Sequence, residues 1–283
     1  MTPTGKRLDA TRILIYASYL IVIVVFWGPV TWMISLSLKT IPDILAYPPR
    51  LFPSRPAIEN YGTIFVQSTI PRNMVNSAKI TVITVVGTLL VTVPAAYGFS
   101  RFRFRGRTQI LMAILLFQMI STLIIILPLY RYFIVLDLLD THHGLIMIYI
   151  TVQIPFTVWL LKGFFDSIPK SLDDAARIDG ASRLQSVIRV IVPVAMPGIA
   201  AAVLFNTINA WSQFLIPFIL IGKGRLQPIS VGVAKYAETV GEAIVTTHLL
   251  AAASLMAMLP AIAIFIALQR FIVRILISGA VKG

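Results

Sequence analysis

The sequence contains no cysteine among its 283 residues, and only 12% of them carry a charged side chain. Without thiols the chain has neither a disulfide framework nor thiolate ligands for a metal. The charged fraction is about half of that expected of a soluble globular protein. Because 58% of the residues are hydrophobic, water is a poor solvent for most of this chain.

Three further absences concern energy coupling, metal binding and catalysis. No Asp, Glu, Lys or Arg lies at the middle of a long apolar run, and His142, His143 and His248 lie at run edges, which argues against an internal proton relay. The adjacent pair His142 and His143 has no carboxylate cluster beside it, so no metal site is predicted. No Gly-rich loop ends in Lys-Ser or Lys-Thr, so this chain is not expected to be an ATP-hydrolysing enzyme. Energy for active transport would have to come from another polypeptide.

The apolar residues gather in six runs of roughly 20, the length at which a helix crosses a bilayer. Backbone groups find no water in lipid, so each run should be helical. The fold class predicted is therefore all-α, a polytopic membrane bundle of six transmembrane helices in one domain spanning residues 1–283, with a core at about 70–270. The runs are Ile13–Ile34, Met74–Phe99, Ile110–Tyr130, Leu145–Leu161, Ile199–Ile221 and Leu249–Ile272.

The net charge of +13 lies at the ends of these runs, which does not suggest nucleic-acid binding. Counting both termini with the second and fourth loops gives fifteen Lys and Arg, against eight in the other loops. By the positive-inside rule these loops and both termini are predicted to be cytoplasmic. The first external segment, residues 35–72, holds six prolines and is expected to be an extended loop, either a docking surface for an extracytoplasmic partner or a plain connector.

The fourth loop has explicit local signals between Ile168 and Pro197. Ser171 is predicted to N-cap a short helix, with Asp173 and Asp174 complementing its positive end. Gly180 fits the left-handed position that ends a helix.

A second helix should follow directly. Ser182 and Gln185 form a capping box, and the helix should run to Pro193. The two short helices joined at a glycine make an elbow (residues 168–193) that could transmit a push from a soluble motor. An amphipathic helix lying on lipid headgroups is the alternative.

The elbow resembles the cytoplasmic signature of permeases from binding-protein-dependent ABC importers. That signature is a Glu-Ala-Ala, then a Gly after three intervening residues, and an Ile-x-Leu-Pro. Here it is Asp174-Ala175-Ala176, Gly180 and Ile191-Val192-Pro193, and Asp179-Gly180-Ala181-Ser182 is typical of the carbohydrate-importing subgroup. Asp174 in place of Glu and Ile275 in place of an expected glycine are departures.

Shorter matches extend along nearly the whole chain and look like the maltose-type second permease. They are Ser37-Leu38-Lys39, Asn60-Tyr61, Asn76-Ser77, Ala95 to Phe102, Leu138 to Thr141, and the tail Gly279 to Gly283.

The resemblance implies a subunit of the bacterial inner membrane that forms half of a translocation pathway for a carbohydrate or polyol. Its partners would be a second permease, two nucleotide-binding subunits that hold ATP and Mg, and an extracytoplasmic substrate-binding protein. The residues implied in coupling to the ATPase are Asp174, Ala175, Ala176, Arg177, Asp179 and Gly180.

A sugar pathway needs hydrogen-bonding groups and aromatic faces. Candidates in the fifth run are Asn206, Asn209, Trp211 and Gln213, of which Asn209 and Gln213 share a helix face; Gln118 and Gln153 are weaker candidates. Polar residues inside membrane bundles also serve as interhelical contacts, and that alternative stays open.

Two other questions stay open. Pro193 and Pro197 mark either a hinge or a simple turn into the fifth span. A self-sufficient sugar channel or facilitator, and a membrane scaffold without a pathway, are the competing functions.

Overall fold

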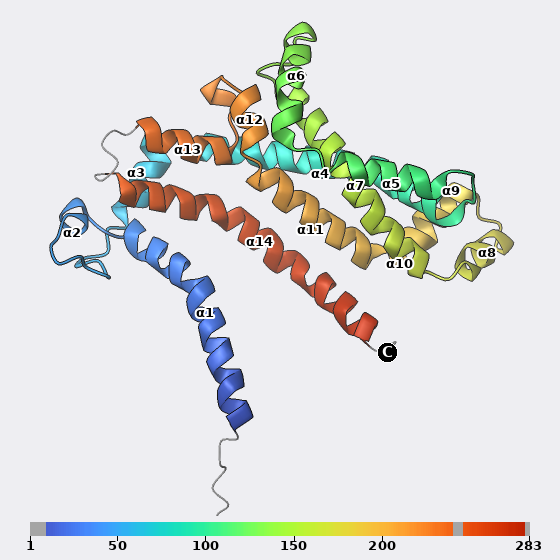
Figure 1. Cartoon of the computed structure of the whole chain (residues 1–283), viewed down its shortest axis with the longest axis horizontal. Helices are drawn as coiled ribbons and strands as arrows, with labels where there is room; N and C mark the ends of the chain where they lie inside the picture. The colour runs from blue at the N-terminus through green and yellow to red at the C-terminus, as the bar shows by residue number, and fades with distance from the viewer. Residues whose placement is uncertain (1–9, 240–245, 281–283) are drawn as a thin grey trace, which may run out of the picture. The chain divides into compact units, whose positions relative to one another are not determined.

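The computed structural model describes residues 10–239 and 246–280, and helices dominate both ranges (Figure 1). No strand occurs in either range, in agreement with the predicted all-α membrane bundle. The helices are α1 (Ala10–Ser37), α2 (Ile41–Ile44), α3 (Glu59–Gln67), α4 (Ile70–Arg101), α5 (Arg107–Phe117), α6 (Thr122–Val135), α7 (His142–Ser167), α8 (Ser171–Ile178), α9 (Arg183–Ser186), the π-helix η1 (Val187–Ile191), α10 (Val192–Val194), α11 (Met196–Ser212), α12 (Leu215–Leu220), the 3-10 turn η2 (Gly224–Leu226), α13 (Ile229–Thr239) and α14 (Thr247–Ala280).

Four helices are long and apolar enough to cross a membrane: Arg12–Ser37, Ile70–Arg101, His142–Ser167 and Thr247–Ala267. They contain the first, second and fourth predicted spans and most of the sixth. Two bent helix pairs, Arg107–Phe117 with Thr122–Val135 and Arg183–Val194 with Met196–Ser212, raise the number to six if each pair counts as one span. The first nine and last three residues lie outside the described ranges, so the cytoplasmic placement of both termini stays a prediction.

The third predicted span, residues 110–130, is not one straight helix. α5 ends at Phe117, and α6 leaves at 87° after a break of four residues. The last turn of α5 tightens, since Met119 and Ile120 donate to carbonyls three residues back, and Ser121 then leaves the helical conformation (ψ of 132°) and is the N-cap residue of α6. Hydropathy does not show this break because the residues on both sides of it are apolar.

The fifth predicted span, residues 199–221, is also broken. α11 ends at Ser212 and α12 begins at Leu215. In a continuous helix the ring of Pro217 would clash with the carbonyl of Gln213. Gln213 is instead extended, and its carbonyl accepts a hydrogen bond from Ser230 Oγ at 2.7 Å.

Contacts divide the chain into two compact units, Thr69–Ala234 with Ala257–Gly283 and Met1–Ser68 with Lys235–Met256. In the larger unit α4 and α7 pack along each other, and α11 lies against both. The face that α4 buries is a stripe of small, mostly polar side chains at helical spacing, which allows close helix approach without lipid-exposed polar groups. The stripe is Asn73, Ser77, Thr81, Thr84, Thr88, Thr92, Ala96 and Ser100.

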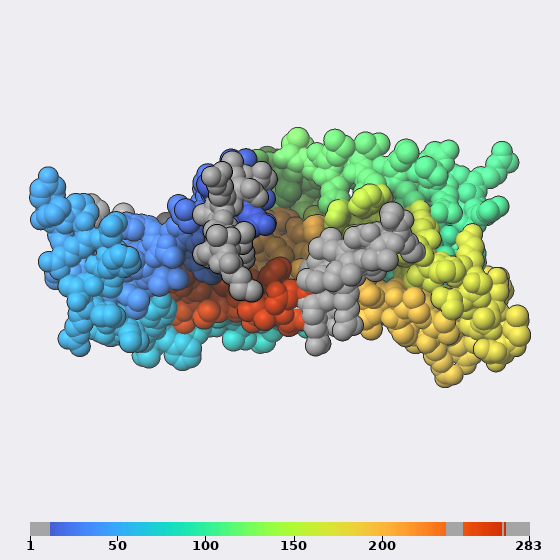
Figure 2. Space-filling model, turned by 90° about the horizontal axis from the view of Figure 1, so that it is seen from below, coloured from blue at the N-terminus to red at the C-terminus, as the bar shows by residue number. Residues whose placement is uncertain are grey.

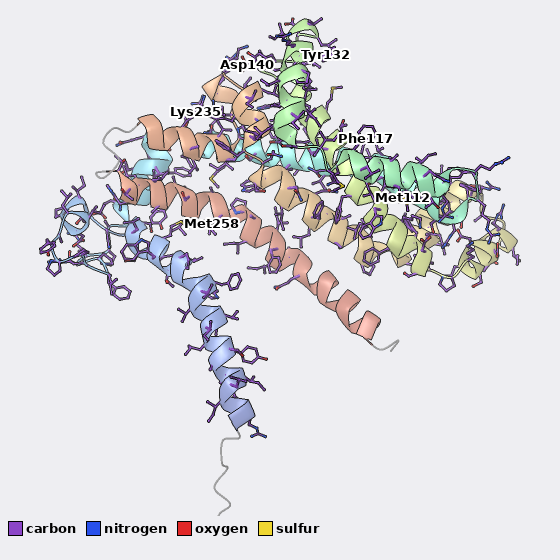
Figure 3. The ribbon with its side chains drawn as sticks, in the orientation of Figure 1. Met112, Phe117, Tyr132, Asp140, Lys235 and Met258 are labelled. Carbon is purple, nitrogen blue, oxygen red and sulfur yellow. The ribbon has the colours of Figure 1, made fainter. Side chains whose placement is uncertain are left out.

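α5 and α6 carry large apolar side chains on their outer faces, among them Met112, Phe117 and Tyr132 (Figure 3). The turn from α6 into α7 is fixed by polar contacts. Asp140 Oδ1 accepts from the backbone N–H groups of Gly222 at 2.6 Å and Lys223 at 2.9 Å. Such a contact anchors the segment after α12 to the start of α7.

In the smaller unit, most of α1 is apolar on all sides and most of its described side chains are exposed within the chain, as expected of a helix that contacts lipid or another membrane subunit. The segment after it is more ordered than the extended loop that its prolines predicted. It contains α2 and α3, and Asn60 Nδ2 donates to the carbonyls of Ser37 at 2.8 Å and Lys39 at 3.0 Å.

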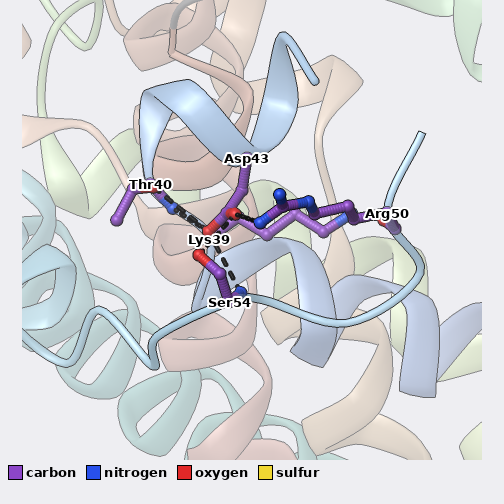
Figure 4. A network of polar contacts seen from close by, with 5 residues as sticks. All are labelled: Lys39, Thr40, Asp43, Arg50 and Ser54. Atoms are coloured by element: carbon purple, nitrogen blue, oxygen red, sulfur yellow. Dashed lines mark hydrogen bonds and ion pairs between the residues drawn. The ribbon is translucent and has the colours of Figure 1, made fainter. Parts of the chain in front are cut away.

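Asp43 is the centre of this segment and is 3% exposed (Figure 4). Its carboxylate accepts from the hydroxyl and backbone N–H of both Thr40 and Ser54, and from Arg50 Nη1 at 3.2 Å. The Ser54 hydroxyl, at 2.7 Å, is the largest cause of the lowered pKa of Asp43, and the contacts with Thr40 add to it. Buried Lys39 closes the loop from the other side by donating to the Arg50 carbonyl at 2.6 Å.

The substitution Asp43→Asn should loosen residues 40–54, because a neutral amide is a weaker acceptor than a carboxylate for the donors of Thr40, Arg50 and Ser54. We expect faster tryptic cleavage after Arg50, which Leu51 follows, in the membrane-inserted protein. Since the pKa of Asp43 is lowered in the folded chain, its contribution is present above the unfolded value of 3.8 and is lost as the pH falls below it. Glu59→Gln, at an exposed site of α3, is the control; cleavage equal to wild type in Asp43→Asn would contradict the prediction.

Candidate functional site

The elbow forms as two short helices around a left-handed glycine. Gly180 has φ of 84°, and α8 ends there in a Schellman motif, with Ala181 N–H donating to the Ala176 carbonyl at 3.0 Å and Gly180 N–H to the Arg177 carbonyl at 3.1 Å. Ser182 then caps α9, and the Ser182 backbone N–H donates to Gln185 Oε1 at 2.9 Å. The glycine turn and this capping box are as predicted.

The predicted N-cap of the first elbow helix is wrong. Lys170 is the N-cap residue and has helical dihedrals, so Ser171 is already the first residue of α8. The helical turn begins at Pro169, whose carbonyl accepts from Leu172 N–H, because proline is well suited to a first helical turn. Asp173 and Asp174 still lie in the first turn, where they complement the helix dipole.

The inner side of α8 is locked to the end of α4 by buried polar contacts. Asp173 accepts from Arg101 Nε and from the Tyr97 hydroxyl, both at 2.7 Å. The side chains of Arg101 and Asp173 are only 8% and 12% exposed. We call Tyr97, Arg101 and Asp173 the elbow lock.

Arg101 extends this lock to the end of α7. Its guanidinium donates to the carbonyls of Phe165 and Ile168, each at 3.0 Å. From the sequence alone, Arg101 lies only within the match Ala95 to Phe102, and Asp173 is only a helix-dipole residue. The available signal was the spacing of Tyr97 and Arg101, which are four apart and so share one face at the end of a long helix.

The outer side of α8 presents most of the residues implied in coupling. Asp174, Ala175, Arg177, Asp179 and Gly180 are exposed. Ala176 is the exception: it is 6% exposed and faces the bundle, so it is not available to a partner. Its small side chain instead lets α8 approach the bundle closely.

Apolar side chains continue this outer surface. Ile178 is 86% exposed, and Leu184 on α9 is 69% exposed. Large aliphatic groups beside charged ones, exposed on a short helix pair, fit a protein-protein interface. The elbow lies at one end of the larger unit, in yellow to gold in Figure 2.

A pocket of about 270 Å³ opens between the end of α4 and the elbow. Arg183 lies over the ring of Phe102, with 5.3 Å from its guanidinium carbon to the ring centroid. Basic residues outnumber acidic ones around the pocket. Its lining is Tyr97, Arg101, Phe102, Lys170, Asp173, Asp174, Arg177, Arg183 and Ser186.

The second elbow helix leads directly into the span. α9, η1 and α10 run on without a break to Val194, and α11 leaves at 77° after one residue, Ala195. The buried side chains of Ile191 and Ala195 belong to the same apolar cluster as Phe165 of α7. Gly198 at the start of α11 lies so close to the Phe164 ring that a Cβ would come within 2.3 Å of it, so the joint is tightly packed. The 77° bend at Ala195, between Pro193 and Pro197, is thus a turn from the elbow into the span.

Two of the four pathway candidates lie inside the bundle. Asn206 is fully buried, and its Oδ1 accepts from Thr157 Oγ1 of α7 at 2.9 Å. Trp211 is 8% exposed, and its indole N–H donates to the Ala257 carbonyl of α14 at 3.1 Å. Both contacts are interhelical, the alternative role for polar residues in a membrane bundle.

The other two candidates share one small pocket. Asn209 and Gln213 line it together with Gln118 and Gln153, which come from the end of α5 and from α7. The structure thus brings four of the amides named from the sequence to one place and separates them from Asn206 and Trp211.

The elbow lock predicts a stability effect. Asp173→Asn removes one partner of a buried ion pair and should cost roughly 3 kcal/mol. We expect a lower melting temperature in mild detergent and faster backbone hydrogen exchange confined to α8. Asp137→Asn, at an exposed turn residue with φ of 57°, is the matched control. Exchange in α8 equal to wild type would show that the lock does not hold the elbow.

Comparisons with known proteins agree with this architecture. Residues 88–278 match the family model described as the binding-protein-dependent transport system inner membrane component. The trehalose transport system permease protein of Mycobacterium tuberculosis is 34% identical over 90% of this chain and 92% of its own length. The sulfoquinovosyl glycerol transport system permease protein of Agrobacterium fabrum is 30% identical over 90% and 88%. A crystal structure of a bacterial ABC transporter that imports alginate superposes with a TM-score of 0.80 at 25% identity, over 95% of this chain and 99% of that one. The chain therefore belongs to the inner-membrane components of binding-protein-dependent transport systems.

Proposed function

We propose that this permease forms half of the translocation pathway of an ATP-driven importer of carbohydrates or polyols. The observation that carries the proposal is the elbow. Its outer face is exposed, its inner face is locked to α4 and α7, and its second helix continues into the span α11. A force on this surface would therefore reach three helices of the bundle.

The partners follow from the same features. Transport by the family to which this chain belongs depends on a binding protein. We assign the exposed elbow residues Asp174, Ala175, Arg177, Asp179 and Gly180 to docking on an ATPase subunit, which would hold ATP and Mg. The apolar exposed surface of α1, α5 and α6 fits lipid and a second permease, with which this chain would form a heterodimer. The carbohydrate class is supported by the sugar substrates in the names of the relatives.

The elbow's left-handed turn gives a sharp test of coupling. Gly180→Val should abolish most sugar uptake, because a β-branched residue at φ of 84° is strained and would displace α9 from α8. A Cβ at this position meets no atom within 4 Å, so the effect is conformational and not a steric clash. Uptake and ATP hydrolysis would be measured in proteoliposomes that contain the complete importer and its binding protein.

Gly180→Asn is the matched control, because asparagine tolerates the left-handed region. It should keep at least half of the wild-type uptake at the same expression level. Equal uptake by Gly180→Val and Gly180→Asn would contradict coupling through this turn. ATP-independent flux by the chain alone would support a facilitator instead.

A further inference from the structure

The small pocket that holds four amides lies where two broken helices meet an unbroken one. Gln118 comes from the break between α5 and α6, and Gln213 from the break between α11 and α12. Gln153 lies on the unbroken helix α7, which lies between the two breaks in the sequence. A broken membrane helix is tolerated where its backbone lines a cavity, so both interruptions direct attention to this site.

Two buried polar atoms at this pocket lack a hydrogen-bond partner within the described part of the chain. They are the Tyr149 hydroxyl, on a side chain 3% exposed, and Gln153 Oε1, on a side chain 6% exposed. An unsatisfied buried polar group lowers the stability of the fold. Both residues line the one pocket, so an occupant that carries hydroxyl groups could supply the missing partners.

The lining selects the chemistry of that occupant. Amide and phenol groups both donate and accept, as an alcohol hydroxyl does, and no residue of the lining is charged. Val152, Phe205 and Ile216 supply apolar walls, and the Phe205 ring is held in place against Phe156 at 4.1 Å between centroids. This combination fits the alternating C–H and O–H groups of an uncharged sugar and offers no counter-charge for an acidic one.

The volume limits how much of a sugar could enter. About 40 Å³ is enough for one hydroxymethyl or one hydroxyl-bearing edge and too small for a whole ring. Asn209 and Gln118 are exposed at the mouth, whereas Tyr149 and Gln153 are buried. A sugar would therefore lie across the mouth and insert one hydroxyl-bearing edge.

We propose that Gln118, Tyr149, Gln153, Asn209 and Gln213 form a subsite that binds one hydroxyl-bearing edge of an uncharged sugar during transport. The inference rests on the proposed function, since it assigns a contact of the transported cargo to this subunit. Asn206 and Trp211 are not part of this subsite, because they do not line the pocket, and Asn206 Oδ1 and the Trp211 indole N–H bond within the bundle.

The test uses the complete importer with its binding protein in proteoliposomes. A panel of uncharged mono- and disaccharides that includes trehalose and maltose is first screened for ATP-driven uptake by the wild type. For the best probe, Tyr149→Phe should raise the KM about fivefold and Gln153→Leu about tenfold, the cost of losing a partner for a buried hydrogen-bonding group.

Ser212→Ala is the control, because Ser212 lies on α11 outside the pocket and its hydroxyl bonds its own helix at the Ile208 carbonyl. A set of monodeoxy analogues of the probe adds a readout that a structural role would not move. One analogue should lose affinity in the wild type and show no further loss in Tyr149→Phe.

Each other outcome has one meaning. KM values within twofold of wild type for both pocket variants would overturn the subsite. The proposed importer function would be unaffected by that result. Efficient uptake by the wild type of only acidic sugars would also overturn it. Absence of ATP-driven uptake for every sugar tested would overturn the proposed function itself, and the subsite with it.

Discussion

The guanidinium of Arg101 joins the three segments on which the architecture of the larger unit depends. It pairs with Asp173 at the start of α8 and donates to the carbonyls of Phe165 and Ile168 at the end of α7, while its own backbone ends α4. A planar group with several donors in fixed directions can satisfy a carboxylate and two carbonyls at once. Lysine could not replace this geometry. Because the pair is buried, leaving either partner alone would be costly, so the elbow and the two central helices are held as one body.

The short motifs that carried the family resemblance are contacts between distant segments. Asn76 Nδ2 donates to the carbonyls of Arg225 at 3.0 Å and Gln227 at 3.1 Å, and Ser77 Oγ accepts from the backbone of Ile229 at 2.8 Å. Asn60 and Tyr61 bond Ser37, and Asp140 bonds the segment after α12. These contacts therefore satisfy backbone groups at loops and helix ends that would otherwise lack partners.

The elbow and the amide pocket both lie where a helix is interrupted. The 77° bend at Ala195 turns the elbow helix into α11, and the breaks at residues 118–121 and 213–214 open the amide pocket. The packing between α4 and α7 has the opposite character, because small side chains on α4 allow two long helices to pack closely and unbroken. A transporter built this way would keep a stiff centre and place its partner-facing and substrate-binding parts at helix breaks.

The sequence by itself determined the membrane class, most of the helix positions, the glycine turn and the capping box, because hydropathy, left-handed glycine geometry and capping act within a few residues. It also pointed to the elbow as the coupling element. It did not separate Asn206 and Trp211, which bond within the bundle, from Asn209 and Gln213, which face a pocket with Gln118 and Gln153. Nor did it show that Ala176 faces inward, that α5 and α6 are bent apart, or that Asp173 pairs with Arg101. These outcomes depend on which faces of distant helices meet, and only the packed tertiary structure decides that.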